Sequence, residues 1–180
     1  MMDLNNSNNA KHTISLLVEN KFGVLARISG LFSARGYNID SLSVGPTDDP
    51  MISRMTIVVK GNDQILEQVE KQLNKLIDVI KVADYRETSH LERELVLVKV
   101  TAEKSLRSEL IQICDIFRAK IVDVAMDSII VEMTGDGEKI EALLRMLRPF
   151  GIKETCRTGI VAMARGSKGI SIAELERVLA

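Results

Sequence analysis

Residues 12–60 read HTISLLVENKFGVLARISGLFSARGYNIDSLSVGPTDDPMISRMTIVVK, and this stretch decides the fold. Residues 12–19 are apolar and rich in β-branched side chains, which predicts a strand. Residues 24–35 repeat apolar side chains with the spacing of one helical face, and Gly36 follows as a natural helix stop. The stretch therefore opens with a strand followed by a helix.

The second half of the stretch returns to the two-residue period of strands. Residues 37–44 alternate apolar and polar side chains, with an irregularity expected near Asp40. A turn dense in Gly, Pro and Asp over residues 45–51 leads to an apolar strand over residues 52–60. These two strands are therefore expected to form an antiparallel pair.

The remaining sequence extends this unit and then repeats it. Residues 63–76 have helical periodicity and residues 78–85 read as a strand, so the order is β-α-β-β-α-β. That order is the ferredoxin-like arrangement, an antiparallel sheet with both helices on one face. The same order recurs in the expected elements 94–101, 105–117, 120–126, 128–133, 136–147 and 152–158. We predict an α+β protein with two tandem ferredoxin-like domains.

The expected domain organisation follows from the polar stretches. Residues 1–11 are predicted to be a disordered tail, 12–85 the first domain, 86–93 a linker, 94–165 the second domain and 166–180 a C-terminal tail. Within that tail, Ser171 and Glu174 fit a capping box at the start of a short helix. The apolar side of this helix is equally compatible with docking on a partner and with packing on its own domain.

Composition excludes several classes of protein. The formal net charge of −1 and an aromatic content of 3% argue against nucleic-acid binding, which depends on basic surfaces and stacking platforms. No apolar run approaches the roughly 20 residues that span a bilayer, and the Asn-rich start does not resemble a secretory signal. Cys114 and Cys156 are far apart in the sequence, as expected for free structural thiols in a cytoplasmic protein.

The sequence contains no recognisable catalytic constellation. The two histidines, His12 and His90, have no Cys, Asp or Glu at metal-ligand spacing, and no nucleophile or phosphate-loop motif occurs. Asp48 and Asp49 lie in a Pro-flanked turn, where solvated carboxylates are the ordinary interpretation. We therefore expect no enzymatic activity, no catalytic residues and no metal site.

One connection has the features of a ligand site. Residues 20–25 read NKFGVL and join the first strand to the first helix, whose N-terminal N–H groups favour a carboxylate. Gly23 permits close approach to the backbone, and the Asn20 amide suits an amino-acid head group. Asn38, on a strand expected to pair beside the first, is placed to reach the same ligand. The competing interpretation is structural, with Asn20 as the helix N-cap and Gly23 as a tight turn.

A resemblance to a known family favours the ligand site. The segment from Glu19 to Val59, with RGYNIDSL, PTDDP and SRMTI, and ERELVLVKV after the linker, closely resembles the small regulatory subunit of acetohydroxyacid synthase, also called acetolactate synthase. The first domain is similar to ACT domains, which sense amino acids. The resemblance covers about residues 12–165.

The resemblance implies a site and a role. Family members bind an inhibitor, usually valine, between the ACT domains of a dimer. The matching residues here are Asn20, Lys21, Phe22, Gly23, Val24 and Leu25 on the loop, with Asn38 from the partner subunit. Lys21 and Phe22 occupy variable positions, and Phe22 is bulky enough to reshape the pocket. The chain would activate a catalytic subunit and make it sensitive to a branched-chain amino acid. Thiamine diphosphate, Mg²⁺ and FAD are expected on that catalytic subunit and no cofactor in this chain.

Alternatives are distinguished by ligand and partner. A freestanding ACT-type sensor of another enzyme would bind an amino acid without affecting acetohydroxyacid synthase, and a nucleic-acid binder would show salt-dependent affinity. A small enzyme would act on pyruvate by itself. The sequence does not determine which branched-chain amino acid is preferred, whether the second domain binds one, or the subunit ratio. Exposed sheet edges lead us to expect at least a homodimer.

Overall fold

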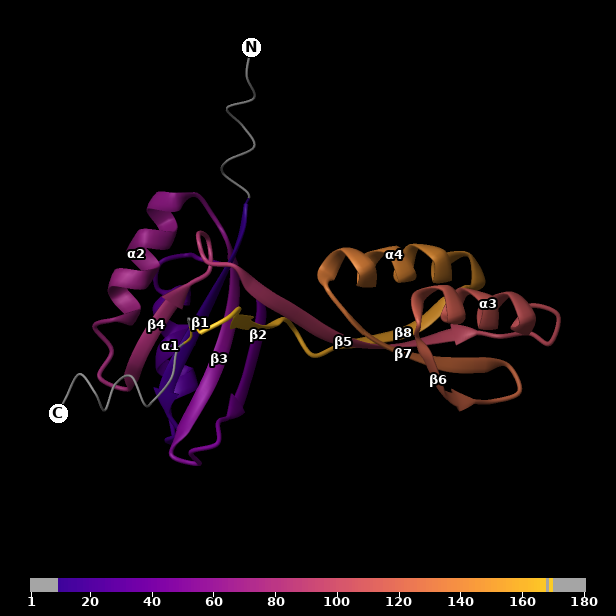
Figure 1. The fold of residues 1–180 in the computed structure, drawn as a ribbon, viewed down its shortest axis with the longest axis horizontal. Coiled ribbons are helices and arrows are strands. Elements are labelled where there is room, and N and C mark those ends of the chain that lie inside the picture. Colours follow the sequence, from indigo (N-terminus) through magenta and orange to yellow (C-terminus); the bar gives the residue numbers. More distant parts are fainter. Residues whose placement is uncertain (1–9, 168, 170–180) are drawn as a thin grey trace, which may run out of the picture. The chain divides into compact units, whose positions relative to one another are not determined.

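The computed structural model describes residues 10–167 and 169, which divide into two compact units (Figure 1). Of these residues, the first unit contains 10–91, 160–167 and 169, and the second contains Glu92–Gly159. Each unit contains the order β-α-β-β-α-β with its helices on one face of a sheet. The predicted α+β class with two ferredoxin-like units is confirmed.

The first unit contains a four-stranded antiparallel sheet. Its elements are β1 (Lys11–Glu19), α1 (Val24–Ser33), β2 (Ile39–Pro46), β3 (Ile52–Lys60), α2 (Asp63–Leu73) and β4 (Val79–Asp84). The strand order is β2-β3-β1-β4, so β2 and β4 are the edges. The expectation that the strand beginning near Asn38 lies beside the first strand was wrong, because β3 lies between them.

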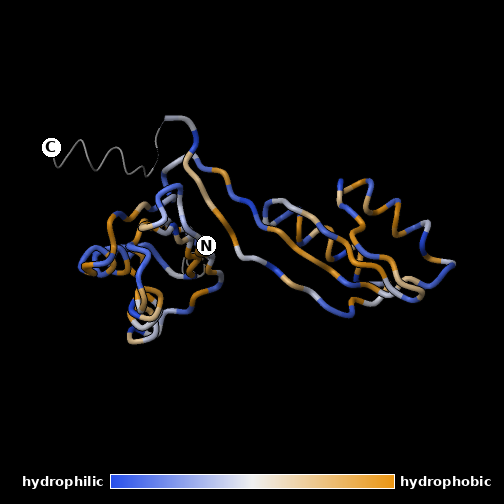
Figure 2. The backbone as a smooth tube through the Cα atoms, turned by 90° about the horizontal axis from the view of Figure 1, so that it is seen from below, coloured by the Kyte–Doolittle hydropathy of each residue, from blue (hydrophilic) through white to orange (hydrophobic). Residues whose placement is uncertain are grey.

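The core of the first unit lies between the sheet and its two helices. Val24, Ile28 and Phe32 of α1 are at most 4% exposed and pack with alternate side chains of β1 and β3. Burying each such side chain contributes about 1.5–3 kcal/mol. Apolar positions in Figure 2 recur along these strands and helices. The helical spacing seen in the sequence is therefore explained by burial of one face.

The irregularity expected near Asp40 is a β-bulge. The pairing of β2 with β3 shifts register between Ile39 and Ser41, so Asp40 is the extra residue. Such a bulge bends a strand and redirects a side chain. Here the redirected carboxylate is 12% exposed and contacts Lys60.

The second unit repeats the topology with its own core. Its elements are β5 (His90–Thr101), α3 (Arg107–Phe117), β6 (Lys120–Val124), β7 (Ser128–Gly135), α4 (Gly137–Leu147), a 3-10 turn η2 (Arg148–Phe150) and β8 (Ile152–Arg157). The strand order is β6-β7-β5-β8. Asp136 is the N-cap of α4 and accepts the Lys139 N–H at 2.9 Å. Both cysteines are free, and burial raises the pKa of the Cys114 thiol, as expected for a structural residue.

An ion-pair network ties β8 to β5 and to α4. Arg157 donates from Nη2 to Glu94 Oε2 at 2.6 Å and from Nη1 to Glu141 Oε1 at 2.8 Å. Glu94 is only 5% exposed, so this guanidinium replaces the water that its carboxylate loses on burial. The hydrogen bond to Glu94 raises the pKa of Arg157.

The chain returns to the first unit after β8. Residues up to 165 were predicted to belong to the second domain. In the structure, β9 (Val161–Ala164) is part of the first unit. Ile160 N–H donates to Ser41 Oγ at 2.9 Å and Ala162 N–H to Thr56 Oγ1 at 3.4 Å. Thr56 alternates with the core residues of β3, so β9 covers the sheet face opposite the helices. A strand of four residues has too little periodicity to be recognised from sequence.

The other boundaries shift by a few residues. β5 begins at His90, four residues before the expected start, so the polar segment after β4 is shorter than the proposed linker 86–93. α1 and α2 end at Ser33 and Leu73. The expected tail over residues 1–11 lies mostly outside the described residues, although Lys11 begins β1. The expected helix after Ser171 also lies outside the described residues.

Candidate functional site

The loop between β1 and α1 is built around Gly23. This residue is the N-cap of α1 and has φ 85°, in the left-handed region that favours glycine. No side chain caps this helix end, so Asn20 is not the N-cap that the structural interpretation required. The first N–H groups of α1 have no intrahelical partners and carry the positive end of the helix dipole. This end of α1 can therefore receive a carboxylate.

Asn20 fastens the loop to the turn between β2 and β3. Its Nδ2 donates to the carbonyl of Pro50 at 2.8 Å, and its backbone N–H donates to the carbonyl of Met51 at 2.7 Å. One hydrogen of the amide nitrogen is engaged within the protein, so the exposed Asn20 side chain presents its oxygen as an acceptor beside one remaining N–H. A ligand that meets this oxygen must donate a hydrogen bond.

The other loop residues fall into three groups. Lys21 pairs with Glu19 at 2.9 Å, and the Phe22 side chain is fully exposed. Val24 is 4% exposed and packs in the core, so only its backbone is available to a ligand. Leu25 is 45% exposed and offers apolar surface beside the helix start.

Asn38 belongs to a charged cluster at the start of β2. Its Nδ2 donates to Asp40 Oδ1 at 3.1 Å, while Asp40 Oδ2 lies 2.9 Å from Lys60 Nζ and 3.9 Å from Lys11 Nζ. The hydrogen bond from Lys60 holds the pKa of the Asp40 carboxyl below its usual value, and Asn38 and Lys11 act in the same direction. Asp40 is thus an anion held by two lysines, and it accepts one N–H of the Asn38 amide.

Asn20 and Asn38 lie at opposite ends of the first sheet. β1 ends with Glu19 opposite Ile52, whereas β2 begins with Ile39 opposite Val59. At about 3.3 Å per residue, Ile52 and Val59 are roughly 23 Å apart along β3. The two asparagines of one chain therefore cannot contact the same small ligand.

Two residues that hold the β1–α1 loop in place, Arg27 and Asp78, were not predicted from the sequence. Arg27 Nε donates to Asp78 Oδ2 at 2.7 Å, and Arg27 Nη1 lies 3.5 Å from the position that a Cβ on Gly23 would take. The Asp78 carbonyl in turn accepts the Glu19 N–H at 2.9 Å. These contacts join residues about fifty positions apart, and no local sequence signal indicates them.

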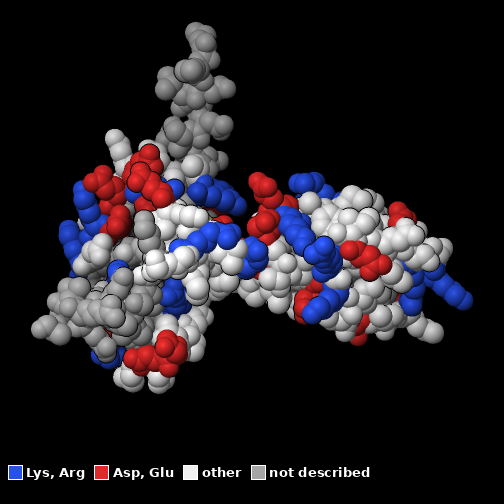
Figure 3. Space-filling model, viewed as in Figure 1, with Lys and Arg blue, Asp and Glu red and all other residues white. Residues whose placement is uncertain are grey.

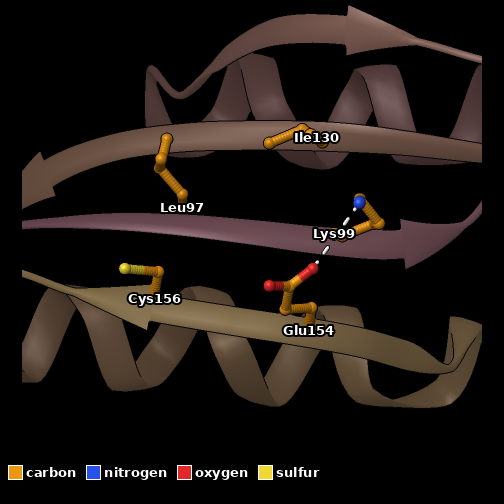
Figure 4. Close-up of a pocket in the computed structure, with 5 residues that line it drawn as sticks. All are labelled: Leu97, Lys99, Ile130, Glu154 and Cys156. Atoms are coloured by element: carbon orange, nitrogen blue, oxygen red, sulfur yellow. Dashed lines mark ion pairs between the residues drawn. The ribbon is translucent and has the colours of Figure 1, made fainter.

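A second candidate lies on the sheet of the second unit. It is a depression of about 110 Å³ lined by Leu97, Lys99, Ile130, Glu154 and Cys156, and Figure 4 shows these side chains on neighbouring strands. Lys99 Nζ and Glu154 Oε2 lie 3.5 Å apart and so neutralise each other. Ligand pockets usually measure about 300–1,000 Å³, so this depression is small for an amino acid with its head group.

The described residues offer little support for other chemistries. Within residues 10–167 and 169, no group of three or more His, Cys, Asp and Glu side chains is placed to hold a metal ion. No helix in this part of the chain is long and apolar enough to cross a membrane. The face in Figure 3 carries basic and acidic side chains side by side, without the one-signed basic surface that phosphate backbones require.

Comparison with known proteins assigns a class to each unit. Residues 14–81 match the family model of the AHAS small subunit-like ACT domain. The first unit is therefore an ACT domain, which agrees with its strand order and its glycine loop. Residues 93–166 match the family model of the small subunit of acetolactate synthase.

Individual relatives agree over nearly the whole chain. A probable acetolactate synthase small subunit of Archaeoglobus fulgidus is 57% identical over 158 residues, which cover 88% of this chain and 99% of that protein. The acetolactate synthase small subunit of Mycolicibacterium smegmatis is 53% identical over 163 residues, covering 91% and 96%. The crystal structure of the Thermotoga maritima small subunit matches with a TM-score of 0.80 and 42% identity, covering 88% and 99%. The chain belongs to the acetolactate synthase small subunit family.

Proposed function

We propose that the chain activates the catalytic subunit of acetolactate synthase and makes it sensitive to feedback inhibition by a branched-chain amino acid, valine first. The chain itself would have no catalytic role, and thiamine diphosphate, Mg²⁺ and FAD would belong to the catalytic subunit. Family membership supports the regulatory role. The main support for a ligand site shared between two chains is that Asn20 and Asn38 lie at opposite ends of the first sheet.

The ligand site would form between two copies of the chain. β2 is an edge strand, and exposed edges are suited to pairing with another chain. Antiparallel pairing of β2 with the same strand of a second copy would place the start of one strand beside the end of the other. Asn38 of one chain would then lie close to the turn at Pro50 of the other, to which Asn20 is fastened. A shared site of this kind links ligand binding to dimer arrangement.

The hydrogen-bond directions set the orientation of the ligand. Each asparagine nitrogen donates one of its two hydrogens within the protein, which leaves each side chain an acceptor oxygen and one N–H donor for a ligand. An α-ammonium group supplies N–H donors for these two oxygens, and the α-carboxylate would lie at the start of α1 beside Gly23. Leu25 would contact the side chain of the ligand. An aliphatic α-amino acid satisfies all three requirements.

The test is calorimetric titration of the native chain with valine, alongside Asn20→Ala and Asn38→Ala. A hydrogen bond to a charged group is worth about 1.5–3 kcal/mol, so each substitution should weaken binding by about tenfold to a hundredfold. Leucine and isoleucine titrations establish the preference. In a parallel assay, added native chain should raise the activity of the catalytic subunit, and valine should lower it. A chain that binds none of the three amino acids and leaves the catalytic subunit unchanged would contradict the proposal.

A further inference from the structure

Four exposed apolar side chains gather at one end of the ACT sheet. They are Met51 (61% exposed), Phe22 (fully exposed), Ile77 (95%) and Leu25 (45%), and we refer to them as the apolar row. Met51 belongs to the turn between β2 and β3, Phe22 and Leu25 to the loop and helix start after β1, and Ile77 to the loop before β4. The row therefore crosses the sheet from one edge toward the other.

Backbone hydrogen bonds hold the three loops side by side. Asn20 N–H donates to the Met51 carbonyl, and Glu19 N–H donates to the carbonyl of Asp78, the neighbour of Ile77. Arg27 closes the arrangement through its ion pair with Asp78. The row is thus a fixed feature of this sheet end and not a chance exposure of separate loops.

The chemistry of the row matches the centre of a protein interface. Such centres are apolar, enriched in aromatic residues and Met, and surrounded by polar residues. Of the charges that flank the row, Lys21 pairs with Glu19 and Arg27 with Asp78, while Asp48 and Asp49 add negative charge in the turn beside Met51. An apolar centre with acidic residues at one end favours a protein surface and disfavours an anionic polymer.

We infer that the apolar row is the surface through which this chain contacts the catalytic subunit, an inference that rests on the proposed function. Pairing of two copies along β2 leaves Ile77 uncovered, because Ile77 precedes β4 at the opposite edge of the sheet. The row is also continuous with the ligand loop, in which Phe22 lies between Asn20 and Gly23. A ligand bound at these two residues would contact the loop that carries Phe22, and the affinity of the row for its partner would then depend on whether the ligand is bound. A contact remote from the loop would have no such connection.

Ile77→Ser is the cleanest test, because Ile77 is the member of the row that is separate from the ligand loop. We expect the concentration of chain needed for half-maximal activation of the catalytic subunit to rise at least tenfold. Phe22→Ser should act in the same direction. Met126→Ser and Ile116→Ser are matched controls in the second unit, since those side chains are 95% and 75% exposed, and each should change the concentration less than twofold.

Two further measurements on Ile77→Ser separate the possible outcomes. Valine binding and the sedimentation coefficient of the chain alone should equal those of the native chain, which shows that fold, ligand site and self-association are intact. Native-like activation by Ile77→Ser would overturn the inference and leave the proposed function standing. Loss of self-association by this variant would also overturn it, because the row would then cover a second copy. Failure of the native chain to activate would remove the proposed function and this inference together.

Discussion

The two units share a topology but begin their first helices differently. In the ACT unit, α1 starts after a left-handed glycine without a side-chain cap, and Asn20 ties the loop to the Pro50 turn. In the second unit, α3 follows Leu106, which has right-handed helical dihedrals. Arg107 there donates to the carbonyls of Ala125 and Met126 at 2.5 and 2.7 Å.

Comparing the two loops distinguishes the contacts that stabilise both folds from the features that only a ligand site requires. Both units fasten the loop after their first strand to the turn of the following strand pair, so this tie serves the fold. Only the ACT unit adds a glycine at the helix start and an amide that presents a free acceptor oxygen. The second unit has a guanidinium engaged with three carbonyls at the corresponding place. Amino-acid binding is therefore expected to be confined to the first unit.

The largest expected effect comes from Gly23→Ala, with Gly36→Ala as its control. Both glycines have positive φ, 85° and 68°, so alanine costs each a similar 1–2 kcal/mol or so of backbone strain. The added Cβ meets no atom within 4 Å at Gly36 and only the Arg27 guanidinium at Gly23. Because strain at Gly23 shifts the ligand loop, valine affinity should fall about a hundredfold there and stay native at Gly36. Equal losses of affinity in calorimetry would show that the loop has no special role.

A change in the second unit should affect stability and leave the ligand unaffected. Arg157→Met removes the partner of the buried Glu94 carboxylate, and the free energy of unfolding of this unit should fall by about 2–3 kcal/mol. Hydrogen exchange should show faster opening of β5, β7 and α4 with little change in β1 and β3. A tenfold weaker valine affinity in this variant would contradict the separation of roles.

A smaller effect is expected from Asp40, which orients Asn38. Asp40→Ala should weaken valine binding about tenfold, whereas Asp40→Asn keeps an acceptor for the Asn38 amide and should weaken it about threefold. Asp115→Ala, at an exposed carboxylate of the second unit, is the control. Unchanged affinity in Asp40→Ala would remove Asp40 from the site.

The pH dependence follows from the same carboxylate. Its pKa is lowered from the ordinary value of 3.8, chiefly by Lys60, so the folded state favours the charged form. The resulting stabilisation is complete above that ordinary value and is lost as the pH falls through the lowered folded pKa. The Asp40 contribution to valine affinity should therefore stay constant between pH 7 and pH 5. Titrations of the native chain and Asp40→Ala at both pH values measure this contribution as a ratio of affinities.

The smallest expected effect on valine affinity comes from a substitution in the second unit, which is not expected to bind the ligand. Calorimetry should give one valine per chain, and Arg107→Lys should change affinity less than twofold, because the helix start of α3 takes no part in binding. Two valines per chain, one of them lost in Arg107→Lys, would show that both units bind and that the comparison drawn from the loops is wrong.

The success of sequence reasoning varied with the range of the interactions involved. Helices such as α1 follow from periodicity, and the bulge at Asp40 follows from a local break in alternation. The position of β3 between β1 and β2, the return of β9 to the first unit and the contact of Asn20 with Pro50 depend on residues distant in the chain. The sequence indicated which residues could bind a ligand. Only the sheet order showed that Asn20 and Asn38 of one chain are too far apart to share it.

Hybrid dimers test the shared site most directly. Asn20→Ala and Asn38→Ala chains, each unable to bind valine tightly, are mixed, allowed to exchange subunits and titrated with valine. In a hybrid, one site has lost both asparagines and the other keeps Asn20 from one chain and Asn38 from its partner. The account predicts that the mixture regains native affinity, at one site per hybrid dimer. A mixture that binds no better than its two parent variants would contradict a site built across two copies of the chain.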